Sequence, residues 1–140
     1  MKVTFDEQED NCWTCTAFKV AMGRPPIRLT LISDNEPDEL YVSAVIKKLK
    51  QLDEFVLSAC NLILENYSYE HYKGLGVPED KLEREETPEA ISSRAVLRSV
   101  WVMSEECDEF ELSFALPWDE YHSYDVEFEN GEPACCAVNG

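Results

Sequence analysis

The stretch FELSFALPWDEYHSYDVEFENGEP, residues 110–133, decides the fold of this chain. Apolar side chains take every second position on both sides of its PWDEYHS segment, at Phe110, Leu112, Phe114, Leu116, Tyr124, Val126 and Phe128. A period of two is typical of strands that bury one face. Asn130-Gly131 favours a type I′ turn, which joins antiparallel strands. The pattern predicts a β-meander in which PWDEYHS connects two strands.

The flanking segments extend the predicted sheet. AVLRSVWVM, residues 95–103, is almost wholly apolar, which predicts a central strand covered on both faces. EPACCAV, residues 132–138, is expected as a last strand at an edge, because Pro133 cannot donate to a ladder. Three further strands are expected near the N-terminus, in MKVTF (1–5), CWTCTAFKVAM (12–22) and PIRLTLIS (26–33).

One long helix is expected between the two groups of strands. Asp34 and Asn35 are candidate caps, and Pro37 suits a first turn. An apolar stripe follows at three- and four-residue steps, through Val45, Leu49, Leu52, Val56, Ala59, Ile63 and Tyr67. We expect this helix to end near Tyr69, before a polar segment at 78–93 that suits a short helix or an exposed loop. The predicted fold class is therefore α+β, a single domain over 1–140 with an antiparallel sheet of about six to seven strands packed on one long helix.

The net charge of −17 is unevenly placed. Residues 1–98 hold 18 acidic and 12 basic side chains, whereas residues 99–140 hold 11 acidic side chains and none that is basic. Phosphate groups are bound by Lys and Arg, so the charge argues against nucleic acid and against an anionic membrane surface as partners. A basic protein is the partner that this field favours. The alternative is that the acidity only keeps the chain in solution.

The expected meander turns Glu111, Asp125, Glu127 and Glu129 to one outward face. Such a face is either simply solvated or a docking surface for a cationic partner. The residues that we expect to meet a partner are acidic side chains around the meander, two aromatic anchors and a histidine: Glu105, Glu106, Asp108, Glu109, Asp119, Glu120, Asp125, Trp118, Tyr121 and His122.

A metal-dependent or otherwise catalytic site centred on His122 is the main alternative. Asp119 and Glu120 precede His122 closely, and mixtures of imidazole and carboxylate suit Mn or Zn. The chain has two histidines and no HxxxH or HxH spacing, and it contains neither a GxSxG motif nor a P-loop. The leading interpretation therefore assigns no catalytic residue, no metal and no other cofactor.

The six cysteines are expected to be free thiols in a reducing cytosol. Cys12 and Cys15 form a CxxC, but in a strand positions i and i+3 point to opposite faces. Cys135 and Cys136 are adjacent and also point apart. A zinc site built from these four residues would need distorted strands.

Residues 94–140 resemble the C-terminal part of a family of small uncharacterised bacterial domains that occur around polymorphic toxin systems. The residues that match its PWD-x-EHG motif and following turn are Pro117, Trp118, Asp119, His122 and the FENG segment at 128–131. Tyr121-His122-Ser123 stands where the family pattern has Glu-His-Gly. The resemblance implies an immunity-type protein, and the charge of residues 99–140 leads us to expect that it neutralises a basic toxin domain.

The N-terminal segment MKVTFDEQED lacks the apolar core of a signal peptide, and no run of about eighteen apolar residues follows, so a cytoplasmic location is expected. Three kinds of function stay open: a protein-binding module, a metal-dependent or catalytic domain, and a structural domain. The identity of the partner and the oligomeric state are open as well.

Overall fold

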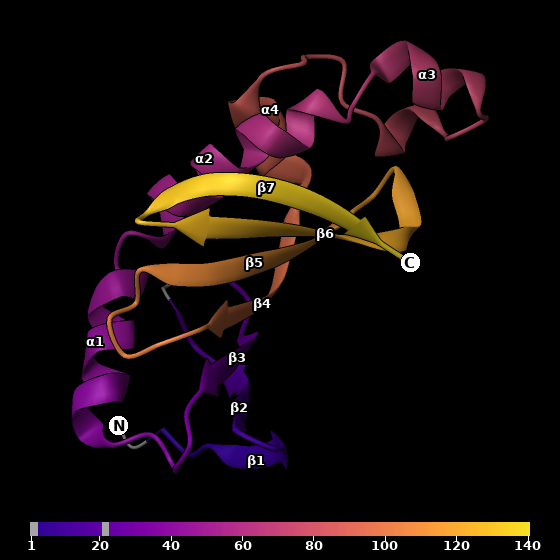
Figure 1. Cartoon of the computed structure of the whole chain (residues 1–140). Coiled ribbons are helices and arrows are strands. Elements are labelled where there is room, and N and C mark those ends of the chain that lie inside the picture. Colours follow the sequence, from indigo (N-terminus) through magenta and orange to yellow (C-terminus); the bar gives the residue numbers. More distant parts are fainter. Residues whose placement is uncertain (1–2, 21–22) are drawn as a thin grey trace.

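Figure 1 shows the computed structural model, which describes residues 3–20 and 23–140. Seven strands form one sheet whose spatial order follows the chain. They are β1 (Asp6–Glu9), β2 (Cys12–Phe18), β3 (Ile27–Ile32), β4 (Val96–Val102), β5 (Glu109–Leu116), β6 (Asp119–Glu129) and β7 (Glu132–Asn139). Between β3 and β4 the chain forms α1 (Glu39–Leu49), α2 (Leu52–Glu65), α3 (Tyr69–Gly74), the short 3₁₀ helix η1 (Glu79–Lys81) and α4 (Pro88–Arg94). The predicted α+β class is confirmed.

Strands β3 and β4 run parallel, whereas the other neighbouring strands are antiparallel. Arg28 lies opposite Ser99, and Leu31 lies opposite Val102. The chain between β3 and β4 contains the helices, and they carry it back to the end of the sheet at which β3 began. A parallel pair requires such a crossover. The expectation of a wholly antiparallel sheet is therefore wrong at this pair.

The expected single long helix is two helices. The carboxylate of Asp38 accepts a hydrogen bond from the Tyr41 N–H at 2.9 Å and caps α1, which ends at Leu49. The apolar stripe continues across the break, since Leu49 and Leu52 are both buried. α2 ends at Glu65, before the expected terminus, and the polar segment at 78–93 forms η1 and most of α4.

The break allows α1 and α2 to cover different strands (Figure 1). The Tyr41 hydroxyl donates to the Ile32 carbonyl at the end of β3, at 2.8 Å. The Phe55 ring of α2 packs on Phe110 of β5 and Phe128 of β6, with centroid distances of 4.9 and 5.6 Å. Neighbouring strands are rotated by about 20° relative to one another, so a single straight helix could not follow both parts of the sheet.

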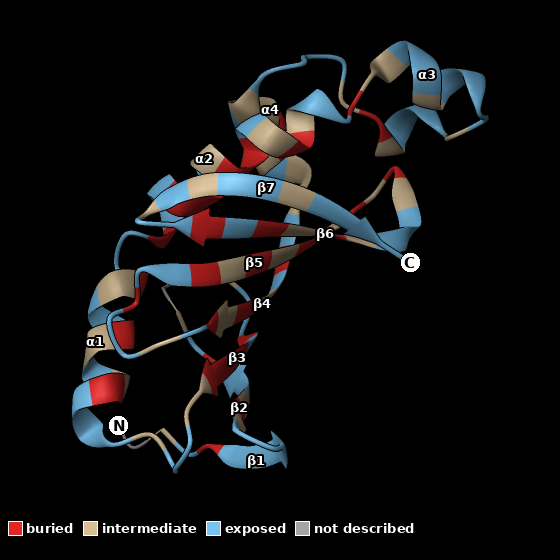
Figure 2. Cartoon of the chain, viewed as in Figure 1, coloured by how far each residue is buried: buried red, intermediate tan, exposed pale blue. Residues whose placement is uncertain are grey.

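The core lies between the helices and one face of the sheet (Figure 2). Phe110, Phe114 and Phe128 are 4%, 1% and 1% exposed, which confirms the inward apolar face of the meander. β4 is central, but only one of its faces is fully buried: Val100 and Val102 are buried, whereas Ser99 and Trp101 on the other face are half-buried. The expectation that β4 is covered on both faces is wrong, because the core occupies one side of the sheet only.

The first strand begins later than expected. β1 spans Asp6–Glu9, whereas the prediction placed a strand at 1–5, of which residues 1 and 2 lie outside the described part. Residues 21 and 22, at the end of the second predicted strand, also lie outside it. Within 3–20 and 23–140, no helix is both long enough and apolar enough to cross a membrane.

Candidate partner-binding surface

Carboxylates face carboxylates across the outer side of β5 and β6. Glu111 is directly opposite Glu127, and Glu109 is directly opposite Glu129. Across the following turn, Glu129 pairs with Glu132 of β7. These five glutamates and Asp125 are called here the acidic face: Glu109, Glu111, Asp125, Glu127, Glu129 and Glu132. This arrangement confirms the outward face that the alternation in sequence predicts.

Partial burial and repulsion between carboxylates shift pKa values on this surface. Burial raises the pKa of Glu111, and the charges of Asp125 and Glu127 raise it further. The exposed Cys135 thiol donates to Glu127 Oε2 at 3.2 Å, and this hydrogen bond raises the pKa of the thiol. Like charges directly opposite one another on neighbouring strands destabilise a sheet by a few tenths of a kcal/mol. The fold therefore tolerates these acids without gaining stability from them.

Basic side chains among the described residues form no ion pairs with the acidic face, and this includes the exposed Arg98 of β4, the strand next to β5. Arg28, a candidate to relieve it, occupies the same row as Asp125, but Ser99 and Ser113 lie between them. Three strand spacings amount to about 14 Å. Salt screens exposed charges at that separation, since the Debye length is about 8 Å at physiological ionic strength.

The β4–β5 turn adds exposed acids to one end of this surface. Glu105, Glu106 and Asp108 are all exposed in the turn. The Asn130 N–H donates to the Asp108 carbonyl at 2.9 Å, which fixes the turn against the β6–β7 hairpin. Glu109 is the first residue of β5 and belongs to the acidic face. Four of the predicted partner-binding residues therefore lie together at one end of the acidic face: Glu105, Glu106, Asp108 and Glu109.

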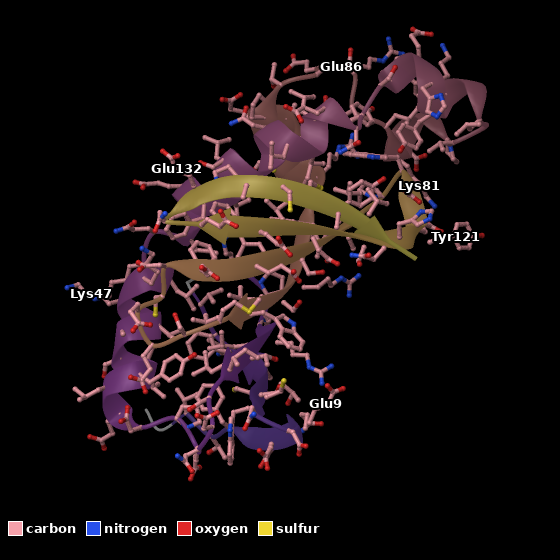
Figure 3. All side chains as sticks on the ribbon, in the orientation of Figure 1. Glu9, Lys47, Lys81, Glu86, Tyr121 and Glu132 are labelled. Atoms are coloured by element: carbon pink, nitrogen blue, oxygen red, sulfur yellow. The ribbon has the colours of Figure 1, made fainter. Side chains whose placement is uncertain are left out.

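Apart from Asp125, the other predicted residues lie at the opposite end of β5. Leu116 pairs with Asp119, and Phe114 pairs with Tyr124, so residues 120–123 form a bulge opposite Ala115. The expected connection at 117–123 is therefore a two-residue turn followed by this bulge in β6. β5 has eight residues, which span about 25 Å. In Figure 3, the labelled residues Tyr121 of β6 and Glu132 of β7 mark the two ends of this outer surface.

Trp118 does not fit the expected role of an aromatic anchor. Its side chain is 4% exposed, and its ring packs on Tyr67 with a centroid distance of 4.4 Å. The apolar ring completes the core where β5 turns into β6, so a partner cannot reach it without local unfolding. Tyr121, by contrast, is 88% exposed at the bulge.

Asp119 holds the bulge by hydrogen bonds. Its Oδ1 lies 2.7 Å from His122 Nδ1, and its Oδ2 accepts from the Tyr124 hydroxyl at 2.6 Å. Tyr72 extends the network, with its hydroxyl 3.4 Å from that of Tyr124. Burial alone would raise the pKa of Asp119, but the hydrogen bonds from Tyr124 and His122 outweigh it and leave the pKa below its usual value.

The residues of the metal alternative are engaged separately. Glu120 Oε1 is 2.6 Å from Lys81 Nζ beside a surface cavity of about 350 Å³, while Asp119 and His122 bind each other. Among the described residues, no group of three or more His, Cys, Asp or Glu side chains is arranged to hold a metal ion. His122 and Asp119 thus serve a structural network in β6.

The cysteines lie as predicted from their strand positions. All six are free thiols. Cys15 and Cys136 pack against the core, whereas Cys135 faces outward beside Glu127. Cys12, three residues before Cys15, is partly exposed.

The predicted site residues thus form two groups, with Asp125 between them on the acidic face. Asp125 accepts hydrogen bonds from Ser113, Ser123 and Asn139. Glu132 is a member of this surface that the sequence reasoning missed, and its place just after the Asn130-Gly131 turn was the available signal. No family model, curated protein or solved structure matches the chain. Surface geometry and charge therefore carry the functional conclusion.

Proposed function

We propose that this protein is a cytoplasmic, immunity-type binding module that captures a basic toxin domain on its acidic face. The observation that carries the proposal is the pairing of Glu111 with Glu127, flanked by Glu109 with Glu129, in a region without a basic partner among the described residues. The resemblance of residues 94–140 to immunity-type domains supports this class of partner.

A cationic partner relieves the repulsion within the acidic face. A Lys or Arg side chain placed between Glu111 and Glu127 interacts favourably with both carboxylates, and the partly buried Glu111 gains most. The negative field also raises the rate of encounter with a basic protein, because opposite charges steer diffusion. Both effects favour a partner that carries several basic residues on one surface.

The bulge offers a second, weaker contribution. Tyr121 is exposed, and tyrosine is enriched among residues that dominate binding energy at interfaces. It lies at the far end of β5 from the β4–β5 turn, so only a partner that spans about 25 Å contacts both. A globular toxin domain has that size.

The test is co-purification and native mass spectrometry with the products of the genes that neighbour this one, among which we expect a basic toxin domain. We expect a complex that weakens as salt rises from about 50 mM to about 500 mM. The double variant Glu111→Gln/Glu127→Gln should weaken binding at least about tenfold. The double variant Asp6→Asn/Glu9→Gln removes the same charge from β1, at the other edge of the sheet, and should bind almost as the original protein does.

Two results would overturn the proposal. One is an absence of salt-sensitive binding, which would indicate that the acidic residues only keep the protein in solution. The other is equal weakening by both double variants, which would show that net charge matters and the acidic face does not.

A further inference from the structure

The two edges of the sheet are built differently. β1 has four residues, Asp6–Glu9, three of which are acidic, and its register with β2 shifts between Glu7 and Glu9. Short, charged and irregular edge strands resist the addition of another strand. β7 forms the opposite edge with eight residues, and its segment 134–139 carries no charge. The yellow strand in Figure 1 is this second edge.

β7 packs against α2, but its main-chain groups on the side away from β6 have no hydrogen-bond partner among the described residues. β7 pairs with β6 alone, and no hydrogen bond joins its main chain to a helix or loop of the described residues. Ala134, Cys135, Ala137, Val138 and Asn139 are all exposed. In an antiparallel ladder, alternate residues of an edge strand turn their N–H and C=O groups away from the sheet. An uncharged edge of this length is a template for strand addition.

The neighbouring strand determines which kind of strand fits. Ala137 lies directly beside Asp125, and Cys135 lies directly beside Glu127, on the outer side of the sheet. Both β7 side chains are small. A strand added to β7 would lie about 10 Å from β6, so its outward Lys or Arg side chains would reach across Ala137 and Cys135 to the two carboxylates.

From this geometry we infer that β7 docks an extended basic segment of the partner as an eighth strand, with alternate Lys or Arg residues turned to the acidic face. The inference rests on the proposed function and specifies how the partner is held. A second copy of this chain is a poor occupant, because each chain carries a net charge of −17 and pairing β7 with β7 would bring two acidic faces together.

The experiment uses two fluorescent peptides of about eight residues. The first alternates Lys with Val, and the second has the same charge but N-methylated amides throughout, so that it lacks main-chain donors and cannot pair with the edge of a sheet. We expect the Lys-Val peptide to bind at least about tenfold more tightly. Amide hydrogen exchange in β7 should slow at least about tenfold with that peptide, while exchange in β1 stays unchanged.

The outcomes separate this inference from the proposed function. Equal, salt-sensitive binding of both peptides with unchanged exchange in β7 would overturn strand addition and leave the acidic face as the docking surface. No binding of either peptide would also overturn it. Slow exchange in β7 without peptide, together with a dimer in native mass spectrometry, would show a second copy on this edge and overturn it as well.

Discussion

Glu111 of β5 and Glu127 of β6 lie directly opposite each other on the outer side of the sheet, and the pKa of Glu111 is raised by burial and by the charges of Asp125 and Glu127. The next outward pair, Ser113 with Asp125, forms a hydrogen bond instead. The Ser113–Asp125 pair therefore stabilises the fold, whereas the adjacent Glu111–Glu127 pair slightly lowers its stability.

Replacing Glu111 with Gln should stabilise the isolated protein at pH 7 by about 0.5 kcal/mol, because it removes a like-charge pair across two strands. The raised pKa means that the folded state takes up a proton more readily than the unfolded state. The destabilisation is therefore present at neutral pH and disappears as the pH falls below about 4. Urea unfolding at pH 7 and at pH 4 measures the gain in stability and its disappearance in acid. The exposed Asp6→Asn change is the matched control, and an equal gain there would contradict the explanation.

Replacing Asp119 with Asn should destabilise the fold at neutral pH by about 1–3 kcal/mol, the usual effect of weakening hydrogen bonds to a charged group. The pKa of Asp119 is below its usual value, so its stabilisation is present above the unfolded pKa of about 3.9 and is lost as the pH falls through the folded pKa. The difference between the two proteins should shrink in acid. Glu120→Gln breaks only the exposed ion pair with Lys81 and should change stability by less than about 0.5 kcal/mol.

Replacing Trp118 with Ala should lower the free energy of unfolding by about 3–5 kcal/mol, because the buried ring packs on Tyr67. Replacing Tyr121 with Ala should change it by less than about 0.5 kcal/mol, since that side chain is exposed. Thermal and urea unfolding of both variants provide the measurement. A stable Trp118→Ala protein with lost partner binding would restore Trp118 as an anchor.

Replacing Thr14 with Val should destabilise the fold by about 1–3 kcal/mol, because its hydroxyl lies 2.8 Å from that of Thr30 and both residues are buried. The buried Thr30 hydroxyl would then lack its hydrogen-bond partner. The double variant Thr14→Val/Thr30→Val removes both polar groups and should recover most of the loss. If the double variant is as unstable as the sum of the single variants, the hydroxyl pair is not the cause.

The alternation of residues 110–133 was enough to predict the meander, its inward phenylalanines and its outward acids. Strand side chains point to opposite faces with a period of two, so the pattern of apolar residues specifies the two faces whatever the neighbours are. The hairpin at Asn130-Gly131 follows from local backbone preference, and both residues do adopt positive φ, 53° and 79°.

Tertiary structure alone decided how distant parts of the chain meet. The break between Leu49 and Leu52 leaves the apolar stripe intact, so the periodicity of the sequence does not reveal it. The twist of the sheet that the two helices cover explains the break. The burial of Trp118 depends on Tyr67, which lies 51 positions earlier in the chain. The separation of the predicted partner-binding residues into two groups depends on the length of β5.

The sequence by itself therefore determined which side chains face outward and what charge they carry, because those properties depend on local spacing and residue type. The folded structure decided which acids face each other, which lie beside a cation and which strand edge is left unpaired. Those relationships depend on register between strands, and register is specified by the whole core rather than by any one segment.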